Sequence, residues 1–376
     1  CMPPAHGSPP ALALTDFTVL PTAPPLALRL PMGRCIALLG IGANTQDLTA
    51  LTEALAGRRP ASGQICVHGM EVGHKPQGAR QIATMGVHAP LFPQLSVTDN
   101  ILFPLRVTGL LPKAEISRRR DEVLALCGLD AVRALSPRAL STEQVFRVAL
   151  ARALVVSPEV VVLNQPMEGM PPPALRRCMM FLERLRQAIG LTSLFLTRDR
   201  MEAFMAASTI GVLDDGHLLQ LADAPTLLNR PASPAVAYAL GEANILTGKV
   251  LRIDDDVAEL RLPSGETVEA MADTDLAEHD LAHICILPDR LSVLFPRAGE
   301  ADISAEADDL PCTLVSAHHL GHTIIMRMRL RDGTEITVIR PPVHTQRELT
   351  AGRPALLAWQ TRNATAFPMD KKASWL

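Results

Sequence analysis

The sequence contains few aromatic residues: phenylalanine, tryptophan and tyrosine make up 3% of its 376 positions, and Tyr238 is its one tyrosine. Proteins that bind single-stranded nucleic acid stack its bases on aromatic rings, and those that bind duplexes carry a basic excess. Here the formal net charge is −3. The composition therefore argues against a nucleic-acid partner.

Long apolar runs and paired cysteines are also absent. No stretch reaches the roughly 18 uninterrupted apolar residues of a membrane helix, and no convincing secretory signal precedes the first predicted strand. The seven cysteines are scattered and without paired spacing, which favours reduced thiols over a disulfide framework. At 376 residues, 48% hydrophobic and 20% charged, the chain is long enough for two domains with separate cores.

Short apolar strands alternate with amphipathic helices over the first two thirds of the chain, which is typical of a mainly parallel sheet covered by helices. Buried strands are predicted at residues 35–40, 160–163 and 192–197. Helices are predicted after the first strand, ending at a glycine cap at Gly57, and after the proline run at residues 171–173. A hairpin is predicted to turn on Asp214, Asp215 and Gly216.

The pattern changes after about Asn244. Residues 248–271 and 322–341 alternate apolar with polar side chains, and Ser264-Gly265 and Asp332-Gly333 lie at the turns. These stretches predict antiparallel strands of a small β domain. We therefore place one domain at residues 1–243 and a β domain at residues 244–376.

Six segments in sequence order resemble ATP-binding cassette (ABC) importer subunits, above all those of spermidine/putrescine, ferric-iron and aminoethylphosphonate uptake. They are LALRLPMGRCIALLG, LFPQLSVTDNILFPLRV, LSTEQVFRVALARAL, VVVLNQP, LFLTRDRMEAFMAASTIGVLDDGHLLQLADAPTLLNRP and ALGEANILTGKV. The resemblance implies an α/β nucleotide-binding domain of the P-loop NTPase type, with a helical subdomain at about residues 94–140. It also implies that the antiparallel β domain is a regulatory barrel similar to the oligonucleotide-binding fold.

In this family a loop of backbone N–H groups holds the phosphates of ATP, a lysine reaches the β- and γ-phosphates, and a Ser or Thr hydroxyl binds Mg²⁺. The corresponding stretch here is two residues longer than the family's, so two alignments stay open. Counting forward from the strand puts Gln46 at the lysine position and Asp47 at the hydroxyl position. Counting back from Gly57 puts Leu48 and Thr49 there. Neither count supplies a lysine, and in the first a carboxylate would repel the phosphates.

The Asp-Glu pair that ends the family's Walker B strand corresponds to Asn164 and Gln165. The family's Asp holds Mg²⁺ through water and its Glu polarises the attacking water, whereas an amide carries no charge and accepts no proton at neutral pH. Loss of a general base costs roughly 10²- to 10⁴-fold in rate. Val87 stands at the position of the Q-loop glutamine. Arg198 stands at that of the switch histidine, where it either neutralises phosphate or forms a salt bridge.

The family signature LSGGQ corresponds to Leu140, Ser141, Thr142, Glu143 and Gln144. Both glycines, which allow close approach to the γ-phosphate, are replaced, and Glu143 adds a negative charge. The candidate nucleotide-binding positions, all vestigial on this interpretation, are Gly40, Gly42, Asn44, Gln46, Asp47, Leu48, Thr49, Val87 and Asn164. We therefore expect ATP and Mg²⁺ to bind weakly if at all, and Gln165 to be inactive.

The segment from Phe92 to Leu105 resembles the groove lining that receives the coupling helix of a permease. Ordinary core packing of the helical subdomain is the alternative. Ser96 or Thr98 is predicted to cap the helix that follows.

The sequence thus predicts a catalytically degenerate cassette subunit of an ABC importer, peripheral at the cytoplasmic face of the inner membrane and docked on permease subunits. A second, intact cassette ATPase is the favoured partner, because two copies of this chain would form two sites without a lysine or a base; a homodimer stays open. The first alternative is a non-enzymatic regulator that senses a ligand through its C-terminal β domain. The second is an active ATPase with unconventional residues, Arg198 included.

No resident metal is predicted. A histidine group lacks the paired spacing of a strong metal site, and we interpret it as part of an exposed loop: His318, His319 and His322, with His283 or Cys312 as further ligands. The run Asp254, Asp255 and Asp256 resembles a calcium loop only in its charge, and a solvated turn is favoured.

Overall fold

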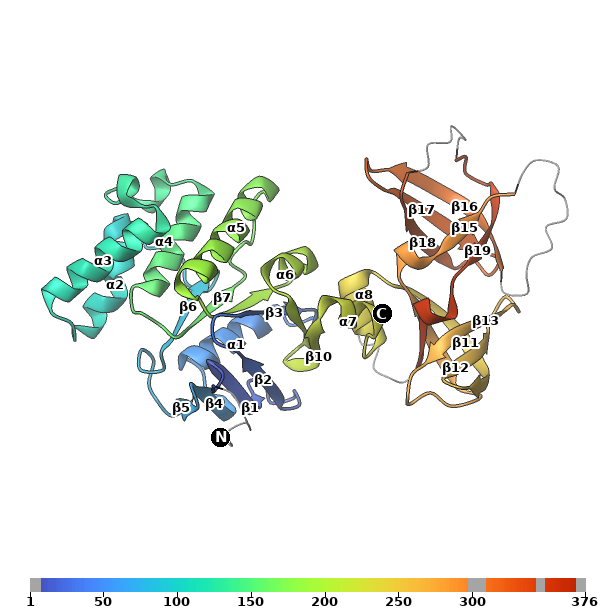
Figure 1. The fold of residues 1–376 in the computed structure, drawn as a ribbon, viewed down its shortest axis with the longest axis horizontal. Coiled ribbons are helices and arrows are strands. Elements are labelled where there is room, and N and C mark those ends of the chain that lie inside the picture. Colours follow the sequence, from blue (N-terminus) through green and yellow to red (C-terminus); the bar gives the residue numbers. More distant parts are fainter. Residues whose placement is uncertain (1–7, 297–308, 343–348, 370–376) are drawn as a thin grey trace. The chain divides into compact units, whose positions relative to one another are not determined.

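The computed structural model describes residues 8–296, 309–342 and 349–369 (Figure 1). The chain forms two compact units, Cys1–Ala224 and Pro225–Leu376. This division precedes Asn244, where the sequence pattern places the start of the β domain. Helices α7 (Ala224–Asn229) and α8 (Pro234–Gly241) lie between the two positions, so the boundary between residues 243 and 244 stays a prediction.

The first unit is built on a six-stranded sheet with the strand order β10-β9-β3-β8-β7-β6. Its neighbouring strands run parallel except for the hairpin of β9 and β10. Strands β7 and β8 are buried along their whole length, as their continuous apolar runs require. The bounds are β3 (Cys35–Gly40), β6 (Ile82–Gly86), β7 (Val160–Asn164), β8 (Ser193–Thr197), β9 (Thr209–Asp214) and β10 (His217–Asp223). The predicted parallel α/β sheet is confirmed.

A four-stranded antiparallel sheet, β2-β1-β4-β5, completes this unit. One hydrophobic core joins both sheets to α1 (Asp47–Ala56), whose Leu48, Leu51 and Leu55 are buried at helical spacing. Gly57 ends α1 in a left-handed conformation, as predicted. The bounds of the strands are β1 (Leu12–Thr18), β2 (Leu26–Leu30), β4 (Ser62–Val67) and β5 (Met70–Glu71).

Helices α2, α3 and α4 pack on one another within the first unit, and α4 also packs against β6 and α5 (Figure 1). Ser96, not Thr98, is the N-cap of α2, since its side chain accepts a hydrogen bond from the Asp99 N–H. The bounds are α2 (Val97–Thr108), α3 (Lys113–Cys127), η1 (Asp130–Val132), η2 (Pro137–Ala139), α4 (Thr142–Leu154), α5 (Pro172–Ile189) and α6 (Arg200–Ala206).

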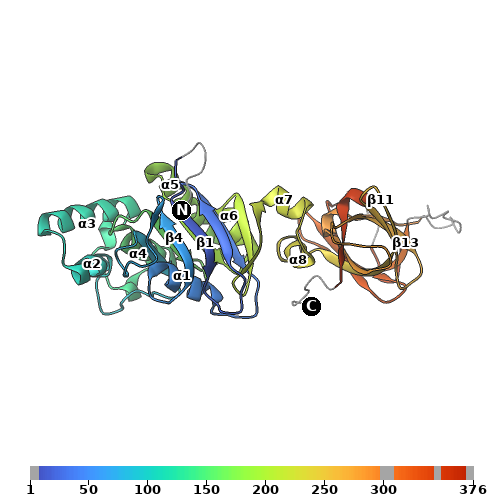
Figure 2. The ribbon, with the colours of Figure 1, turned by 90° about the horizontal axis from the view of Figure 1, so that it is seen from below.

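The second unit contains a closed barrel, β11-β12-β13-β20-β14, and a five-stranded sheet, β15-β19-β16-β17-β18. The strands of the barrel curve around its core in Figure 2. All barrel pairs are antiparallel except β13 with β20. The bounds are β11 (Asn244–Asp254), β12 (Val257–Arg261), β13 (Thr267–Ala272), β14 (Leu281–Ile286), η3 (Pro288–Arg290), β15 (Ser292–Leu294), β16 (Leu310–His319), β17 (Ile324–Leu330), β18 (Glu335–Arg340), β19 (Pro354–Ala358), η4 (Thr361–Asn363) and β20 (Ala364–Pro368).

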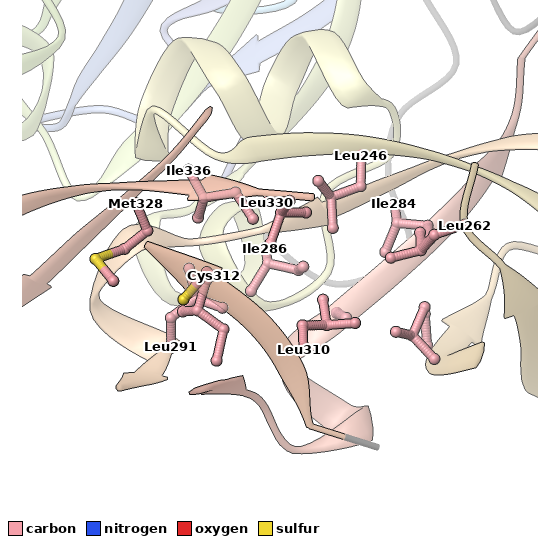
Figure 3. Close-up of a cluster of buried hydrophobic side chains, with 14 of the residues drawn as sticks. Leu246, Leu262, Ile284, Ile286, Leu291, Leu310, Cys312, Met328, Leu330 and Ile336 are labelled. Atoms are coloured by element: carbon pink, nitrogen blue, oxygen red, sulfur yellow. The ribbon is translucent and has the colours of Figure 1, made fainter. Parts of the chain in front are cut away.

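One hydrophobic core joins the barrel of the second unit to its sheet, and a smaller buried cluster includes Ala237, Cys285 and Leu287. Figure 3 shows Leu246 and Ile284 from the barrel together with Leu310, Met328 and Ile336 from the sheet. The predicted turns at Ser264-Gly265 and Asp332-Gly333 join β12 to β13 and β17 to β18. The predicted β domain is therefore confirmed.

Two expectations from composition can be compared with this structure. Among the described residues, no helix has both the length and the apolar character needed to cross a membrane. Cysteines 35, 127, 178, 285 and 312 are free thiols. Cys66 is disulfide-bonded, whereas the five free thiols agree with the expected preference for reduced cysteines over a disulfide framework.

Candidate nucleotide site

The candidate phosphate loop connects strand β3 to the start of helix α1. The strand ends at Gly40 and the helix begins at Asp47, with the loop between them. Asn164, at the end of β7, donates from Nδ2 to the Thr49 hydroxyl over 3.0 Å. In P-loop NTPases the loop hydroxyl and the Walker B acid hold the same Mg²⁺, so these two positions must lie together. The contact therefore favours the second alignment, with Leu48 at the lysine position.

The side chain at that lysine position belongs to the hydrophobic core. Leu48 is fully buried and packs in the core that joins the two sheets. It also lies against the end of β3, because a Cβ placed on Gly40 would be 3.1 Å from Leu48 Cδ2. An apolar side chain held in this way offers no cation to a phosphate.

A buried ion pair occupies the first turn of α1. The Asp47 side chain has no exposed surface, and its Oδ1 accepts a hydrogen bond from Arg198 Nη2 at 2.5 Å. Its Oδ2 is buried and has no hydrogen-bond partner in the described part of the chain. Burial raises the pKa of Asp47, and the Arg198 guanidinium opposes that rise. Arg198, at the switch-histidine position, is thus held against the loop by a carboxylate of the protein.

Three backbone N–H groups in the loop and the first turn donate to side-chain oxygens of the protein. The Asn44 N–H donates to Asp215 Oδ1 at 2.9 Å. The Gln46 N–H donates to Asn44 Oδ1 at 2.9 Å, and the Leu48 N–H to Asp47 Oδ1 at 2.8 Å. In a P-loop, groups at these places would donate to phosphate oxygens. Side chains of the protein therefore use hydrogen-bond donors that a nucleotide would need.

The turn of the β9–β10 hairpin lies directly on the loop. A Cβ placed on Gly42 would be 2.0 Å from Asp215 Oδ1 and 2.5 Å from the Asp215 backbone nitrogen. Position 42 therefore accommodates only glycine, because a side chain there would collide with Asp215. The predicted hairpin is confirmed, with Asp214 paired to His217, but its contact with the loop was not predicted. A carboxylate in this place would repel a phosphate.

The two amides at the Walker B position are bonded to the protein. Asn164 is fully buried, and besides its bond to Thr49 it accepts at Oδ1 from Gln165 Nε2 at 3.3 Å. Gln165 has a φ of 48°, which is uncommon for a residue other than glycine. Its N–H donates to the Leu196 carbonyl at 2.8 Å. Neither amide can take a proton from a water molecule.

Val87 and His88 both lie beside the Walker B position, and the Val87 N–H donates to the Asn164 carbonyl at 3.1 Å. The Val87 side chain is 42% exposed. The two imidazole nitrogens of His88 lie 3.4 Å from Asn164 Nδ2 and 3.0 Å from Thr84 Oγ1. Burial, with the nearby arginines Arg58 and Arg152, lowers the pKa of His88 to about 4. Sequence analysis did not single out His88, and the signal that could have found it is its ionisable side chain just after the strand.

The residues aligned with the signature form the start of α4. Ser141 is the N-cap: its Oγ accepts from the Gln144 N–H at 3.2 Å, and Gln144 Oε1 accepts from the Ser141 N–H at 2.9 Å. This reciprocal capping box stabilises the helix end. The carboxylate of Glu143 pairs with Arg177 of α5 at 2.9 Å. Ser141 and Gln144 therefore have a structural use that needs no nucleotide.

The segment from Phe92 to Leu105 is fixed by one buried amide. Asn100 is fully buried and accepts from the Phe92 N–H at 2.8 Å. Its Nδ2 donates to the carbonyls of Phe92 and Ser96, each at 3.0 Å. The chain before α2 is thereby held in a defined shape.

Apolar side chains at the end of this segment remain exposed. Phe103 is 40% exposed, Val107 69% and Leu110, just after the helix, 84%. Phe103 and Val107, four residues apart, lie on one side of α2, and Leu110 follows the C-cap Gly109. Exposed apolar side chains gathered in this way mark interaction surfaces.

The other motifs lie in the second unit. Among the described residues, no group of three or more His, Cys, Asp or Glu could hold a metal ion. His318 and His319 are exposed at the end of β16, whereas Cys312 is buried. Asp255 and Asp256, both in left-handed conformations, form the turn between β11 and β12.

The donors at the candidate site do not fit Mg²⁺ and a triphosphate. Mg²⁺ prefers carboxylate and phosphate oxygens, whereas the chain presents the Thr49 hydroxyl and the Asn164 amide, with the His88 imidazole beside them. The nearby carboxylate of Asp47 is paired with Arg198.

The fold and the position of this site define a P-loop NTPase-type cassette domain followed by a small β domain. The sequence model of the ABC transporter family matches residues 24–168, and that of the TOBE domain matches residues 284–367. The spermidine/putrescine import ATP-binding protein PotA 1 of Pseudomonas aeruginosa is 34% identical over 82% of this chain and 82% of its own length. The chain belongs to the family of ATP-binding subunits of ABC import transporters.

Other relatives import different solutes. An Fe(3+) ions import ATP-binding protein of Rhizobium meliloti is 32% identical over 66% of this chain and 69% of its own length. A sulfate/thiosulfate import ATP-binding protein of Methylococcus capsulatus is 36% identical over 59% of this chain and 65% of its own length. These comparisons confirm the predicted family.

Proposed function

We propose that this chain is a cassette subunit of an ABC importer that hydrolyses little or no ATP itself, and that it docks on a permease beside a second, intact ATPase subunit. The buried pair of Asp47 and Arg198 is the observation that carries the proposal. It joins the phosphate loop to the switch position through groups of the protein.

Two features support the loss of nucleotide binding. The lysine position favoured by the Asn164–Thr49 contact carries buried Leu48, so no cation meets the β- and γ-phosphates. The Asp215 carboxylate accepts a loop N–H, so a phosphate would have to displace it. Both features weaken the binding of an anion at this loop.

The amides at the Walker B position support the loss of hydrolysis. Gln165 stands where the family places the base that polarises water, and its side chain donates to Asn164. An amide cannot act as that base, and loss of a general base costs roughly 10²- to 10⁴-fold in rate.

The proposed pairing rests on the family resemblance, which implies that two cassette subunits form a dimer with two composite sites. Two copies of this chain would form two composite sites without a lysine or a base. A second subunit with intact motifs would supply both, so we favour a heterodimer. The exposed residues Phe103, Val107 and Leu110 support docking on the permease at the end of α2. The relatives are named for different solutes, so the proposal names none.

Phosphate release by the purified chain with ATP and Mg²⁺ tests the catalytic part. We expect the rate of a blank without protein. The double variant Asn164→Asp, Gln165→Glu should stay at that rate, because it leaves Leu48 and the Asp47–Arg198 pair in place.

The decisive comparison uses two glutamines. Steady Mg²⁺-dependent hydrolysis that is lost in Gln165→Ala and kept in Gln187→Ala would overturn the proposal. Gln187 is a suitable control, because it lies exposed on α5 and bonds only locally to Glu183.

Docking has its own test, which is copurification of the chain with a coexpressed permease. Phe103→Asp combined with Val107→Asp should abolish copurification, whereas Ile189→Asp, an exposed apolar position at the end of α5, should not. Equal copurification of all these variants would contradict docking at this surface.

A further inference from the structure

A hollow of about 380 Å³ opens on the outer face of the barrel in the second unit. Its lining includes Thr247, Lys249, Leu251, Arg261, His279 and Leu281. Small-molecule sites typically have volumes of about 300–1,000 Å³, so the hollow is large enough for one.

The strand pairing explains why these side chains gather outside the barrel. Along β11, Leu246, Gly248 and Val250 are buried, whereas Thr247 and Lys249 are exposed. Successive side chains of a strand point to opposite faces, and Figure 3 shows Leu246 within the core. Thr247 and Lys249 therefore point away from the core.

Two irregularities shape the wall of the hollow. The pairing of β11 with β12 shifts between Val250 and Arg252, which leaves Leu251 as an extra residue. Such bulges redirect side chains, often beside functional sites. His279 has a φ of 73°, and its N–H donates to the Val250 carbonyl at 3.0 Å. A left-handed conformation at a residue other than glycine carries strain. The hydrogen bond to Val250 holds His279 beside β11 in this conformation.

Two cations face each other in the hollow. Lys249 on β11 is directly opposite Arg261 on β12, and like charges in this arrangement destabilise a sheet. Within the described residues, neither side chain has a carboxylate within ion-pair distance. Their neighbour Arg252, in contrast, is paired with Glu259. The repulsion between Lys249 and Arg261 would be relieved by an anion bound between them.

The acidic residues nearest in sequence to His279 are engaged elsewhere. Asp280 Oδ2 accepts from the Ala277 N–H at 2.9 Å. Glu278 Oε1 accepts from the Ile253 N–H at 3.1 Å. Within the described residues, neither carboxylate forms an ion pair with Lys249 or Arg261.

Apolar surface lies beside the cations. Leu281, directly opposite Lys249 on β14, is 55% exposed. Leu251 and Pro263 also line the hollow. An inorganic ion would leave this apolar surface in water, whereas a ligand with an apolar group would cover it.

We propose that the hollow binds a small organic anion. Its phosphate or carboxylate group lies between Lys249 and Arg261, where a guanidinium donates two parallel hydrogen bonds and an ammonium adds charge. Its apolar part covers Leu251, Pro263 and Leu281. The proposal is independent of the proposed function, because it concerns the second unit and holds whether or not the cassette binds ATP.

Calorimetric titration of the full chain with phenyl phosphate, inorganic phosphate and phenol tests this site. We expect saturable binding of phenyl phosphate, weaker binding of inorganic phosphate and none of phenol at millimolar concentrations. Lys249→Gln and Arg261→Gln should each weaken phenyl phosphate binding about tenfold, since each removes a charged hydrogen-bond donor.

Arg29→Gln is the matched control, because it removes an exposed arginine from β2 in the first unit and should leave the affinity unchanged. Absence of phenyl phosphate binding at millimolar concentrations would overturn the site. So would an affinity for phenyl phosphate in Lys249→Gln and Arg261→Gln that equals that of the unmodified protein. Equal affinity for phosphate and phenyl phosphate would overturn the assignment of an organic ligand. Unchanged thermal unfolding of the variants ensures that loss of binding is not loss of fold.

Discussion

The Arg198 guanidinium and the Asp47 carboxylate meet at 2.5 Å although 151 positions separate them in the sequence. The pair joins the residue after β8 to the first turn of α1. It occupies the place where the resemblance to active cassettes leads one to expect a switch histidine and a nucleotide. Under the proposed function, this pair stands in place of contacts to a nucleotide.

Removing the arginine should destabilise the fold. In Arg198→Ala the Asp47 carboxylate would remain buried without its cation, and breaking such a pair typically costs 3–5 kcal/mol. Since Arg198 is 28% exposed, we expect a value near the lower end, about 3 kcal/mol. Urea-induced unfolding of the first unit measures it.

The double variant Asp47→Ala, Arg198→Ala is the control for that loss. Removing both partners leaves no unpaired buried charge, so the double variant should lose less stability than Arg198→Ala alone. If the loss of stability in the double variant equals the sum of the losses in Asp47→Ala and Arg198→Ala, the two side chains are not coupled.

Gly42→Ala should also destabilise the protein, by about 1–3 kcal/mol. Its new Cβ would meet the Asp215 backbone nitrogen at 2.5 Å, so the β9–β10 turn would have to move. Gly78→Ala tests backbone strain alone, because Gly78 has a φ of 86° and nothing within 4 Å of its added Cβ. Thermal unfolding that is unchanged in Gly42→Ala would argue against close contact between the turn and the loop.

His88 should make stability depend on pH. Its pKa is about 4 in the folded protein and about 6.5 in an unfolded chain. Between these values the unfolded chain binds a proton that the folded protein does not, so stability is lost as the pH falls from about 6.5 to 4. The full difference in pKa corresponds to about 3.4 kcal/mol. Because the imidazole is only partly buried and solvent screens its charge, we expect a loss of about 2 kcal/mol.

His88→Gln provides the comparison, because glutamine is polar but does not titrate. Its urea midpoint should fall less over this pH range than that of the unmodified protein. Parallel pH profiles would place the acid sensitivity at other groups.

The capping box predicts that Ser141 contributes to stability. Ser141→Ala should cost about 1 kcal/mol, because the Gln144 N–H loses its acceptor. Thermal unfolding measures this loss, and Ser141→Asp, which can cap equally well, should restore most of it. A cost in Ser141→Ala that aspartate does not reduce would contradict the capping role.

The sequence predicts strands, helix ends and turns of this protein well, because the residue patterns that specify them are local. Continuous apolar runs predict β3, β7 and β8, and Gly57 ends α1 as predicted. The turn residues locate the hairpins. Such features depend on the residue types within a few positions of one another.

The partners of the residues at the site could not be predicted in this way. Two alignments of the loop stay open from the sequence, and the contact between Asn164 and Thr49, 115 positions apart, favours one of them. The contact of Asp215 with Asn44 joins residues even further apart, by 171 positions. Pairings of this kind depend on how strands meet in the sheet. The approach of the His88 side chain to Asn164 depends in the same way on how β6 and β7 lie side by side.

Calorimetric titration of the purified chain with ATP and Mg²⁺ tests the central claim most directly, since binding precedes any turnover. We predict no saturable heat at millimolar nucleotide, with or without Mg²⁺, while the protein remains folded. Mg²⁺-dependent binding with a micromolar Kd, weakened by Thr49→Ala or Asn164→Ala, would contradict the account.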